Sequence, residues 1–398
     1  MRLINRSSIA LWGDQGRGAF LLVLATGAVF VLGLALQLIA VRALDSAAYA
    51  TFVLALGLAT IASMVASSVQ PVVAMRVLSD QAGYLPFGLR TGMPTLGILT
   101  VAVWLALTGT IGNSGALLVA IQLPMHLAVG VLSGLIQGRR SFGTLSLGMA
   151  VWSASRVGAA SLLLILGVDA EVSLLFALDA ALFAHLIVLA LGVSWSSACW
   201  TTSKSSLRDF SEFAGWLASG CLLFGDAIAC RLLLPDVSAA RYALAVTLGR
   251  QAVFAASPLS TVLLTTVQER PDDRGRLGLV AGIAVVLTVF LGAGVGIAPA
   301  AAVALLTGSA SLADPWLIRG YVLVGGLGAA AVLLLAWAGG LGRLPATGLQ
   351  LLALAGALSV GLVADSARSL LLMQSVLVVG LVLVTGTACI RRSNTPSR

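Results

Sequence analysis

Two arginines lie in the middle of long apolar runs, where a charged side chain is least expected. Arg156 stands in "VWSASRVGAAS" and Arg250 in "AVTLGRQAVF", each several residues from any other charge. A charge deep in an apolar span is costly, so its presence there suggests a function. Because a guanidinium group matches phosphate oxygens with two parallel hydrogen bonds, we predict that Arg156 and Arg250 line a cavity for a phosphate-bearing ligand.

Two aspartates also lie within apolar runs and could carry a proton or another coupling ion. Asp226 and Asp179 are the deep acids of the chain, and both are candidates for ion coupling. Asp226 could instead form an ion pair with Arg250 or with Arg231. Asp179 lies six residues before His185, which is not a spacing that places two side chains on one helix face. A proton relay between Asp179 and His185 therefore stays open, without support from the spacing.

A polar interruption occurs twice in the chain. "LALQLIAVRALDSAAYATFV" (34–53) contains Gln37 and Arg42, and "FGDAIACRLLLPDVSAARYALAV" (224–246) contains Asp226 and Arg231. In each stretch the two polar residues are five apart, and the arginine leads through a short link to a tyrosine that opens the next apolar run. The recurrence predicts an internal repeat of the chain.

The arginines of this repeat have two interpretations. Arg42 and Arg231 lie near the ends of their apolar runs, where an arginine can reach the membrane interface or offset a helix dipole. Alternatively, they line the same cavity as Arg156 and Arg250, together with Gln37. We retain Arg42, Arg231 and Gln37 as candidate substrate-binding residues.

The elements that position these residues are membrane helices. Hydrophobic residues make up 59% of the chain, charged residues 10%, and the mean hydropathy is +1.05. Soluble domains contain about 25% charged residues, and the apolar runs here are long enough to cross a bilayer. No ten-residue alternating segments of a membrane β-barrel are visible. The net charge of +8 comes from short loops between apolar runs and does not indicate a nucleic-acid partner.

The apolar runs predict about twelve transmembrane helices in an all-α polytopic protein. Most basic residues gather in alternate loops, which places both termini in the cytoplasm. The predicted spans are 20–41, 47–73, 88–110, 116–136, 143–167, 173–194, 212–234, 240–266, 277–299, 316–338, 344–363 and 369–390. The residues before the first span could form a short amphipathic helix on the cytoplasmic surface of the membrane.

The repeat and the span count together predict two pseudo-symmetric lobes of six helices. The N-terminal lobe covers 1–194, a cytoplasmic linker 195–211, the C-terminal lobe 212–390, and a cytoplasmic tail 391–398. Six spans repeated in the same orientation imply a two-fold axis along the membrane normal, as in secondary transporters with parallel repeats.

The sequence contains no motif of common enzymes or metal sites. Its only lysine is Lys204, outside any P-loop pattern, and HExxH and GxSxG are absent. The four cysteines form no CxxC pair, and His126 is interpreted as a helix-packing residue. We expect neither a catalytic residue nor a metal site nor a cofactor.

Three stretches resemble the polysaccharide flippases, the Wzx-like branch of the multidrug/oligosaccharidyl-lipid/polysaccharide (MOP) exporter superfamily. They are "AVRALDSAAYATFVLALGLATIASMV" (40–65), "GDAIACRLLLPDVSAARYALA" (225–245) and "LLTGSASLADPWLIRGYVLVGGLGA" (305–329). The resemblance implies a MATE-like arrangement of the two lobes and a bacterial plasma-membrane protein. It also implies a polyprenyl-diphosphate-linked oligosaccharide as substrate, moved by alternating access, and the polymerase and glycosyltransferases of the same pathway as partners.

Two other functions stay open at this stage. An ion-coupled exporter of small molecules would have the same fold and would use acids such as Asp226 and Asp179. An integral-membrane glycan ligase or polymerase usually has a large external loop with catalytic residues, and the external loops predicted here are short.

Overall fold

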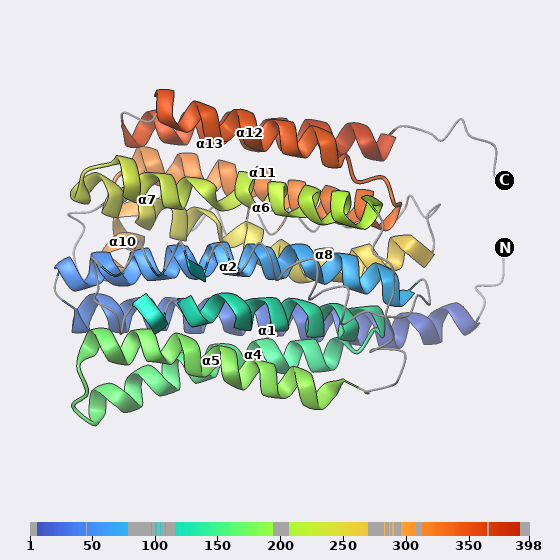
Figure 1. The fold of residues 1–398 in the computed structure, drawn as a ribbon, viewed down its shortest axis with the longest axis horizontal. Coiled ribbons are helices and arrows are strands. Elements are labelled where there is room, and N and C mark those ends of the chain that lie inside the picture. The colour runs from blue at the N-terminus through green and yellow to red at the C-terminus, as the bar shows by residue number, and fades with distance from the viewer. Residues whose placement is uncertain are drawn as a thin grey trace.

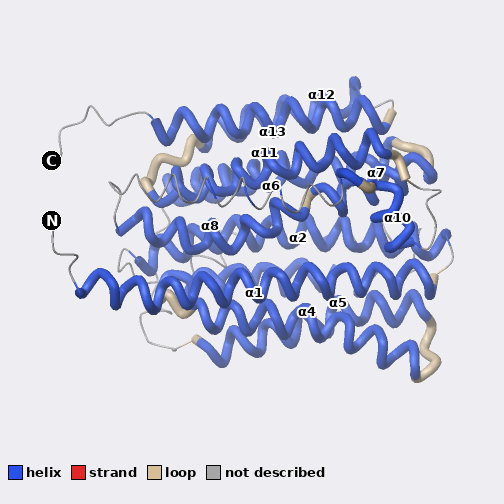
Figure 2. Tube along the Cα trace, turned by 180° about the vertical axis from the view of Figure 1, so that it is seen from behind, coloured by secondary structure: helices blue, strands red, loops and turns tan. Residues whose placement is uncertain are grey.

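The computed structural model is a bundle of long helices, and its described residues contain no strand (Figure 2). It describes residues 6–44, 46–78, 116–118, 120–193, 207–269, 296–307, 313–363 and 366–390, with isolated helical positions between 97 and 108 and between 282 and 289. The helices are α1 (Arg6–Ala43), α2 (Ser46–Leu78), a helix over Ala116–Gly138, α4 (Phe142–Ile165), α5 (Ala170–Gly192), α6 (Leu207–Leu233), α7 (Asp236–Gly249), α8 (Gln251–Glu269), α10 (Pro299–Thr307), α11 (Pro315–Gly340), α12 (Ala346–Val363) and α13 (Ala367–Ile390).

The described helices divide into two halves that follow the chain order. α1, α4 and α5 pack together, and α11 packs with α7, α8 and α13 on the other side of the bundle (Figure 1). Between the halves, α2 packs against α6 and α1 packs against α8. The sequence repeat makes α1 correspond to α6, and α2 to the span formed by α7 and α8. When each helix is replaced by its counterpart, the α2–α6 contact becomes the α8–α1 contact, and the reverse. The packing therefore has the symmetry that the sequence repeat predicts, while the exact lobe boundaries stay predictions.

Six described helices are long and apolar enough to cross a membrane: Phe20–Ala40, Ala116–Gly138, Phe142–Ile165, Ala170–Gly192, Pro315–Gly340 and Ala367–Cys389. Large apolar side chains such as Phe183, Leu191 and Val376 are exposed on the outside of the bundle. Such a surface is stable only against lipid, and the chain is a multi-pass membrane protein. The predicted spans 88–110 and 277–299 fall mostly outside the described residues, so the count of twelve stays a prediction.

Two spans differ from the sequence prediction. α1 begins at Arg6 and continues without interruption into the first predicted span. The eighth span was expected to run unbroken over 240–266, but the helix is interrupted at Arg250, between α7 and α8. Hydropathy is averaged over many residues, so it cannot detect a helix interruption at one residue that has apolar residues on both sides.

Small residues allow close packing of α2 on the 116–138 helix. Gly130, Gly134 and Gly138 are four residues apart and so form one stripe along that helix. A Cβ atom added at any of them would come within 3 Å of Ala66, Gln70 or Val77 of α2 respectively, or of atoms beside them. Membrane helices associate through such small-residue contacts because lipid provides no hydrophobic force between them.

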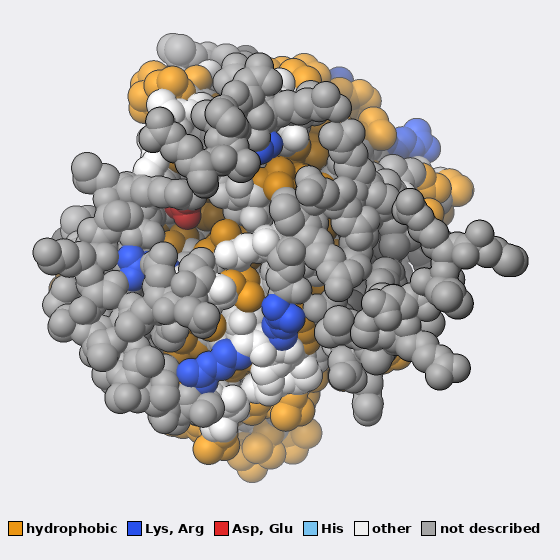
Figure 3. Space-filling model, turned by 90° about the vertical axis from the view of Figure 1, so that its right-hand side faces the viewer, with side chains coloured by type: hydrophobic (Ala, Val, Ile, Leu, Met, Phe, Trp, Pro, Cys, Tyr) orange, Lys and Arg blue, Asp and Glu red, His pale blue; other side chains and the backbone are white. Residues whose placement is uncertain are grey.

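α1 begins and α13 ends at one end of the bundle (Figure 1), and the two halves contact each other there. One core cluster joins Val72 and Val73 of α2 and Ile136 of the 116–138 helix to Phe213 of α6. Figure 3 views the molecule from this end and shows Arg side chains on the described surface with little acidic surface between them. The charge agrees with the predicted cytoplasmic side, which stays a prediction.

A hydrogen-bonded glutamine also crosses between the halves at this end. Gln137, at the end of the 116–138 helix, accepts from Gln70 of α2 at 2.9 Å. Its Nε2 donates across the interface to the carbonyl of Thr261 on α8 at 3.0 Å. Gln137 is 2% exposed, so this contact is shielded from water.

Candidate functional site

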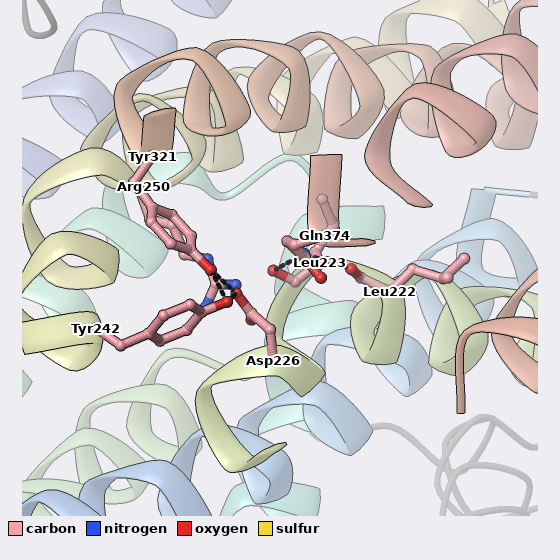
Figure 4. A network of polar contacts seen from close by, with 7 residues as sticks. All are labelled: Leu222, Leu223, Asp226, Tyr242, Arg250, Tyr321 and Gln374. Carbon is pink, nitrogen blue, oxygen red and sulfur yellow. Dashed lines mark hydrogen bonds and ion pairs between the residues drawn. The ribbon is translucent and has the colours of Figure 1, made fainter. Parts of the chain in front are cut away.

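The second half contains a buried polar network of four side chains from three helices and one helix break. Asp226 comes from α6, Tyr242 from α7, Arg250 from the α7–α8 break and Tyr321 from α11, and Figure 4 shows them pointing toward one another. Each of the four is at most 3% exposed. We call this group the C-half network.

Asp226 is the acceptor at the centre of the C-half network. The Arg250 guanidinium donates from Nη2 to Asp226 Oδ1 and forms an ion pair with it. The Tyr242 hydroxyl donates to Oδ2 at 3.0 Å, and the Tyr321 hydroxyl contacts both Oδ2 and the Tyr242 hydroxyl oxygen. The carboxylate therefore has donors on both oxygens, as a buried charge requires.

The interruption of the eighth span places Arg250 in this network. Arg250 follows the last residue of α7, and its N–H still donates to the Val246 carbonyl at 3.0 Å. A Cβ atom at Gly249 would overlap the backbone of Tyr321, and one at Gly325 would overlap the carbonyl of Gly249. Two facing glycines thus let α11 touch the backbone at the break, which brings Tyr321 to Asp226.

A glutamine holds α13 against the same part of α6. Gln374 Nε2 donates to the Leu222 carbonyl at 2.8 Å and approaches the Leu223 carbonyl at 3.4 Å (Figure 4). These carbonyls lie one turn before Asp226. α6 is therefore fixed by α7, α11 and α13 around its acid.

The first half holds its arginine in a different way. Arg156 of α4 lies over the ring of Trp152, one turn earlier, with the guanidinium carbon 3.9 Å from the ring centroid. The ring of His185 on α5 lies near that of Trp152, with the ring centroids 6.2 Å apart, and His126 of the 116–138 helix lies near His185 and Arg156. We call these four side chains the N-half cluster.

Arg156 has no acid partner in the part of the chain that the structure describes. Its contact there is the Trp152 ring, and its buried Nε lacks a hydrogen-bond acceptor. A cation–π contact offsets part of the desolvation of a guanidinium, by about 2 kcal/mol when the pair is dry. The positive charge itself is not neutralised by it.

Asp179 of α5 is a second polar group in the first half without a partner among the described residues. Both carboxylate oxygens are buried and unpaired, and the same holds for both amide atoms of Gln122 on the 116–138 helix. The two side chains lie close to one another without reaching hydrogen-bond geometry. Buried polar groups are almost always paired, so this pair is a candidate binding site for a cation or a proton.

The other predicted residues do not join either group. Arg42 is exposed at the end of α1, and Gln37, five residues earlier, is half-buried and has polar or electrostatic partners of its own. Arg231 lies on α6 five residues after Asp226, and its side chain is outside the described residues. Of the two arginines considered as partners for Asp226, Arg250 forms an ion pair with it in the structure.

Two contributors to these groups were not identified from the sequence. Tyr321 and Trp152 carry no charge and lie in apolar runs, so nothing distinguishes them from lipid-facing aromatic residues. Tyr242 was noted only as part of the repeat. A polar hydroxyl in a membrane span close to an acid of another span is the signal that could have indicated the two tyrosines. Among the described residues, no group of three or more His, Cys, Asp and Glu could hold a metal ion.

Solved structures of transporters share the architecture described above. A crystal structure of MATE in complex with MaL6 matches with a TM-score of 0.70 at 13% identity, over 95% of this chain and 94% of that one. The chain has the MATE fold. A MOP superfamily transporter from Pyrococcus furiosus, described as having a binding pocket of reverse polarity, matches with a TM-score of 0.68 at 13% identity, over 96% and 95% of the chains. The eukaryotic MATE transporter AtDTX14 matches with a TM-score of 0.63 at 17% identity, over 94% and 95%.

No family model matches the sequence, and no curated protein matches it. At such low identity the MATE fold is what the structural likeness establishes. Any statement about cargo has to come from the polar groups of this chain.

Proposed function

We propose that this chain is a transporter of the MOP superfamily that moves a polyprenyl-diphosphate-linked oligosaccharide across the bacterial plasma membrane by alternating access. The observation that carries the proposal is Arg156, a guanidinium inside a membrane helix of a MATE fold, without an acid partner among the described residues. A cation within a membrane span that has no anionic partner among the described residues is suited to an anionic ligand. The diphosphate of a lipid-linked glycan is such a ligand, and its lipid tail can stay in the bilayer.

The surroundings of Arg156 support the same class of substrate. His126 and His185 add imidazole N–H groups close to the guanidinium, and Trp152 offers an aromatic face of the kind that stacks on sugar rings. The symmetric contacts between the halves provide two bodies that can rock against each other. The MATE fold of the chain belongs to transporters in the solved structures, which supports transport over glycan ligation or polymerisation.

The experiment is flipping of a fluorescent polyprenyl-diphosphate-linked disaccharide in proteoliposomes, with a membrane-impermeant quencher to report the outer leaflet. Arg156→Ala should reduce the protein-dependent rate at least tenfold at unchanged protein level, because the charge that binds the diphosphate is gone. Arg368→Ala is the matched control: Arg368 also stacks on a tryptophan, Trp316 at 5.4 Å, but is exposed at the start of α13. Full activity of Arg156→Ala would overturn the assignment of the diphosphate to this arginine.

An ion-coupled exporter of small molecules is the second candidate, and Asp179 favours it. Two unpaired carboxylate oxygens beside the Gln122 amide are suited to a cation or proton, which a drug or metabolite exporter would use for coupling. The same proteoliposomes distinguish the two. Accumulation of a lipophilic cation driven by a pH or sodium gradient, without flipping of the lipid-linked disaccharide, would favour the exporter.

A further inference from the structure

In the C-half network, the Arg250 guanidinium could bind a ligand anion, but the Asp226 carboxylate already pairs with it. We propose that an anionic phosphate group of the substrate and the Asp226 carboxylate compete for Arg250, and that Asp226 takes up one proton from solvent when the anion displaces it. The inference rests on the proposed function, because it requires an anionic substrate. It assigns proton coupling to the second half of the molecule and adds Tyr242 and Tyr321 as positioning residues.

The pairing of Arg250 leaves part of its guanidinium unused. Among the described residues, the Arg250 side chain forms a single hydrogen bond, from Nη2 to Asp226 Oδ1. Its remaining contacts are with aromatic rings: the guanidinium carbon lies 5.3 Å from the Phe224 ring centroid and 5.8 Å from the Tyr321 ring centroid. A guanidinium can donate five hydrogen bonds in a planar fork. The fork of Arg250 therefore has donors left for the oxygens of a phosphate.

Asp226 can remain hydrogen-bonded in either charge state. As a carboxylate it accepts from Arg250, Tyr242 and Tyr321. As a neutral acid it can donate its proton to one tyrosine oxygen and still accept from the other hydroxyl, since the two hydroxyls already contact each other. Loss of Arg250 would leave a buried carboxylate without a counter-charge, and such a group takes up a proton instead of staying ionised.

Three titratable groups interact with this acid among the described residues. Arg250, Tyr242 and Tyr321 are the titratable groups that interact with it, and α13 faces α6 one turn away with the neutral Gln374. The two tyrosines therefore hold the acid, while Arg250 is the cation that pairs with it among the described residues.

The position of Arg250 connects the network with the interface between the halves. Arg250 immediately precedes α8, which packs against α1 and α2. Ala252 and Ala256 at the start of α8 belong to the same core cluster as Ala74 of α2. A movement of one half against the other acts on α8 directly, and the break at Gly249 and Arg250 is where the span can bend. Opening of the interface can thus expose the guanidinium, which is 3% exposed in the present conformation.

The test measures binding of farnesyl diphosphate to the detergent-solubilised full chain by calorimetry, at several pH values and in buffers of different ionisation enthalpy. Inorganic pyrophosphate forms the second arm. The wild type should take up one more proton per bound farnesyl diphosphate than Asp226→Asn, and its Kd should rise about tenfold more per pH unit, as one linked proton requires. Asp226→Asn should also bind more tightly at high pH, because the competing anion is gone.

Asp169→Asn is the matched control for this substitution. Asp169 caps α5 by accepting from Val172 N–H at 3.0 Å, and asparagine caps a helix equally well. Its binding and proton count should equal those of the wild type. If Asp226→Asn does not fold, Tyr321→Phe replaces it: removal of one donor to the carboxylate should favour the protonated acid and tighten farnesyl diphosphate binding.

Each outcome has a distinct meaning. Equal proton counts in the wild type and Asp226→Asn, or weaker binding in Tyr321→Phe, would show a purely structural ion pair and overturn the inference while leaving the proposed substrate class in place. Failure of the wild type to bind either probe would overturn the proposed substrate class together with the inference. Binding of farnesyl diphosphate but not pyrophosphate assigns the phosphate to a lipid, and equal binding of both assigns it to a soluble anion.

Discussion

Replacement of Gln137 by alanine should loosen the contact between the halves at the end that carries both termini. Gln137 is the side chain whose amide joins the 116–138 helix of the first half to the Thr261 carbonyl of α8 in the second, at 3.0 Å. Alanine removes this bond and also the bond from Gln70 at 2.9 Å, which lies within the first half. Only the first of these two bonds favours the closed interface over an open one.

The size of the effect follows from that single bond. A hydrogen bond between protein groups contributes about 1 kcal/mol net, because water replaces the partner when the bond opens. About 1 kcal/mol changes the ratio of closed to open molecules about fivefold. The substitution should therefore shift the population without unfolding the protein, since the packing of Val72, Val73, Ile136 and Phe213 at this end is untouched.

The measurement is the distance distribution between spin labels at residues 141 and 347, in a background without native cysteines. Ser141 and Thr347 are exposed, Ser141 just after the 116–138 helix and Thr347 at the start of α12. Gln374→Ala is the matched control, because Gln374 is equally buried and donates to a carbonyl at 2.8 Å, but within the second half. A longer-distance population in Gln137→Ala alone is expected. The same distribution in both variants, shifted or unshifted, would refute the reasoning.

Two further substitutions test the glycine contacts. Gly325→Ala should lower the temperature of unfolding, because its Cβ atom would overlap the Gly249 carbonyl and overpacking costs about 1–3 kcal/mol; Gly225→Ala, one residue before Asp226 with nothing within 4 Å of the added carbon, should be neutral or slightly stabilising by comparison. Gly134→Leu should separate α2 from the 116–138 helix and reduce the yield of monodisperse protein, whereas Gly158→Leu, which faces open space on α4, should not. Equal melting temperatures within the first pair, or equal yields within the second, would contradict the packing described here.

The helical membrane fold was predictable because apolar runs of this length have few alternatives. A chain with 59% hydrophobic residues has to place them against lipid and each other, and helices satisfy their own backbone there. The starts of individual helices also follow from local chemistry. Asp169 and Asp314 each cap a helix, and Asp314 accepts from the N–H groups of Trp316 and Leu317 just after it. Such capping signals depend only on neighbouring residues, so they can be recognised from the sequence.

The arrangement of the C-half network needs contacts that no local pattern contains. The pairing of Asp226 with Arg250 was one of two alternatives, and the choice depends on where the eighth span breaks. The close contact at that break depends in turn on Gly249, whose missing side chain matters because Tyr321, far along the chain, comes to lie against it. Gly325 and Gly328 both lie at close contacts between helices, but neither glycine identifies the partner helix from the sequence. A glycine in a membrane span indicates that another helix packs closely there, but it does not identify that helix.

The two halves hold their deep arginines under opposite conditions, and this difference bears on how transport would be energised. Arg250 is neutralised by Asp226 inside the same half, whereas Arg156 rests on Trp152 with no acid beside it in the described residues. A ligand anion that reaches Arg156 meets a positive charge that no acid neutralises in the described residues. A ligand anion that reaches Arg250 has to displace the Asp226 carboxylate, which then takes up a proton. Under the proposed function, binding to the first half would therefore depend little on pH, and binding to the second half would weaken as pH rises. If the substrate moves from Arg156 to Arg250, its binding is coupled to proton uptake only at Arg250. A pH gradient could therefore set the direction of substrate movement, which would otherwise be reversible.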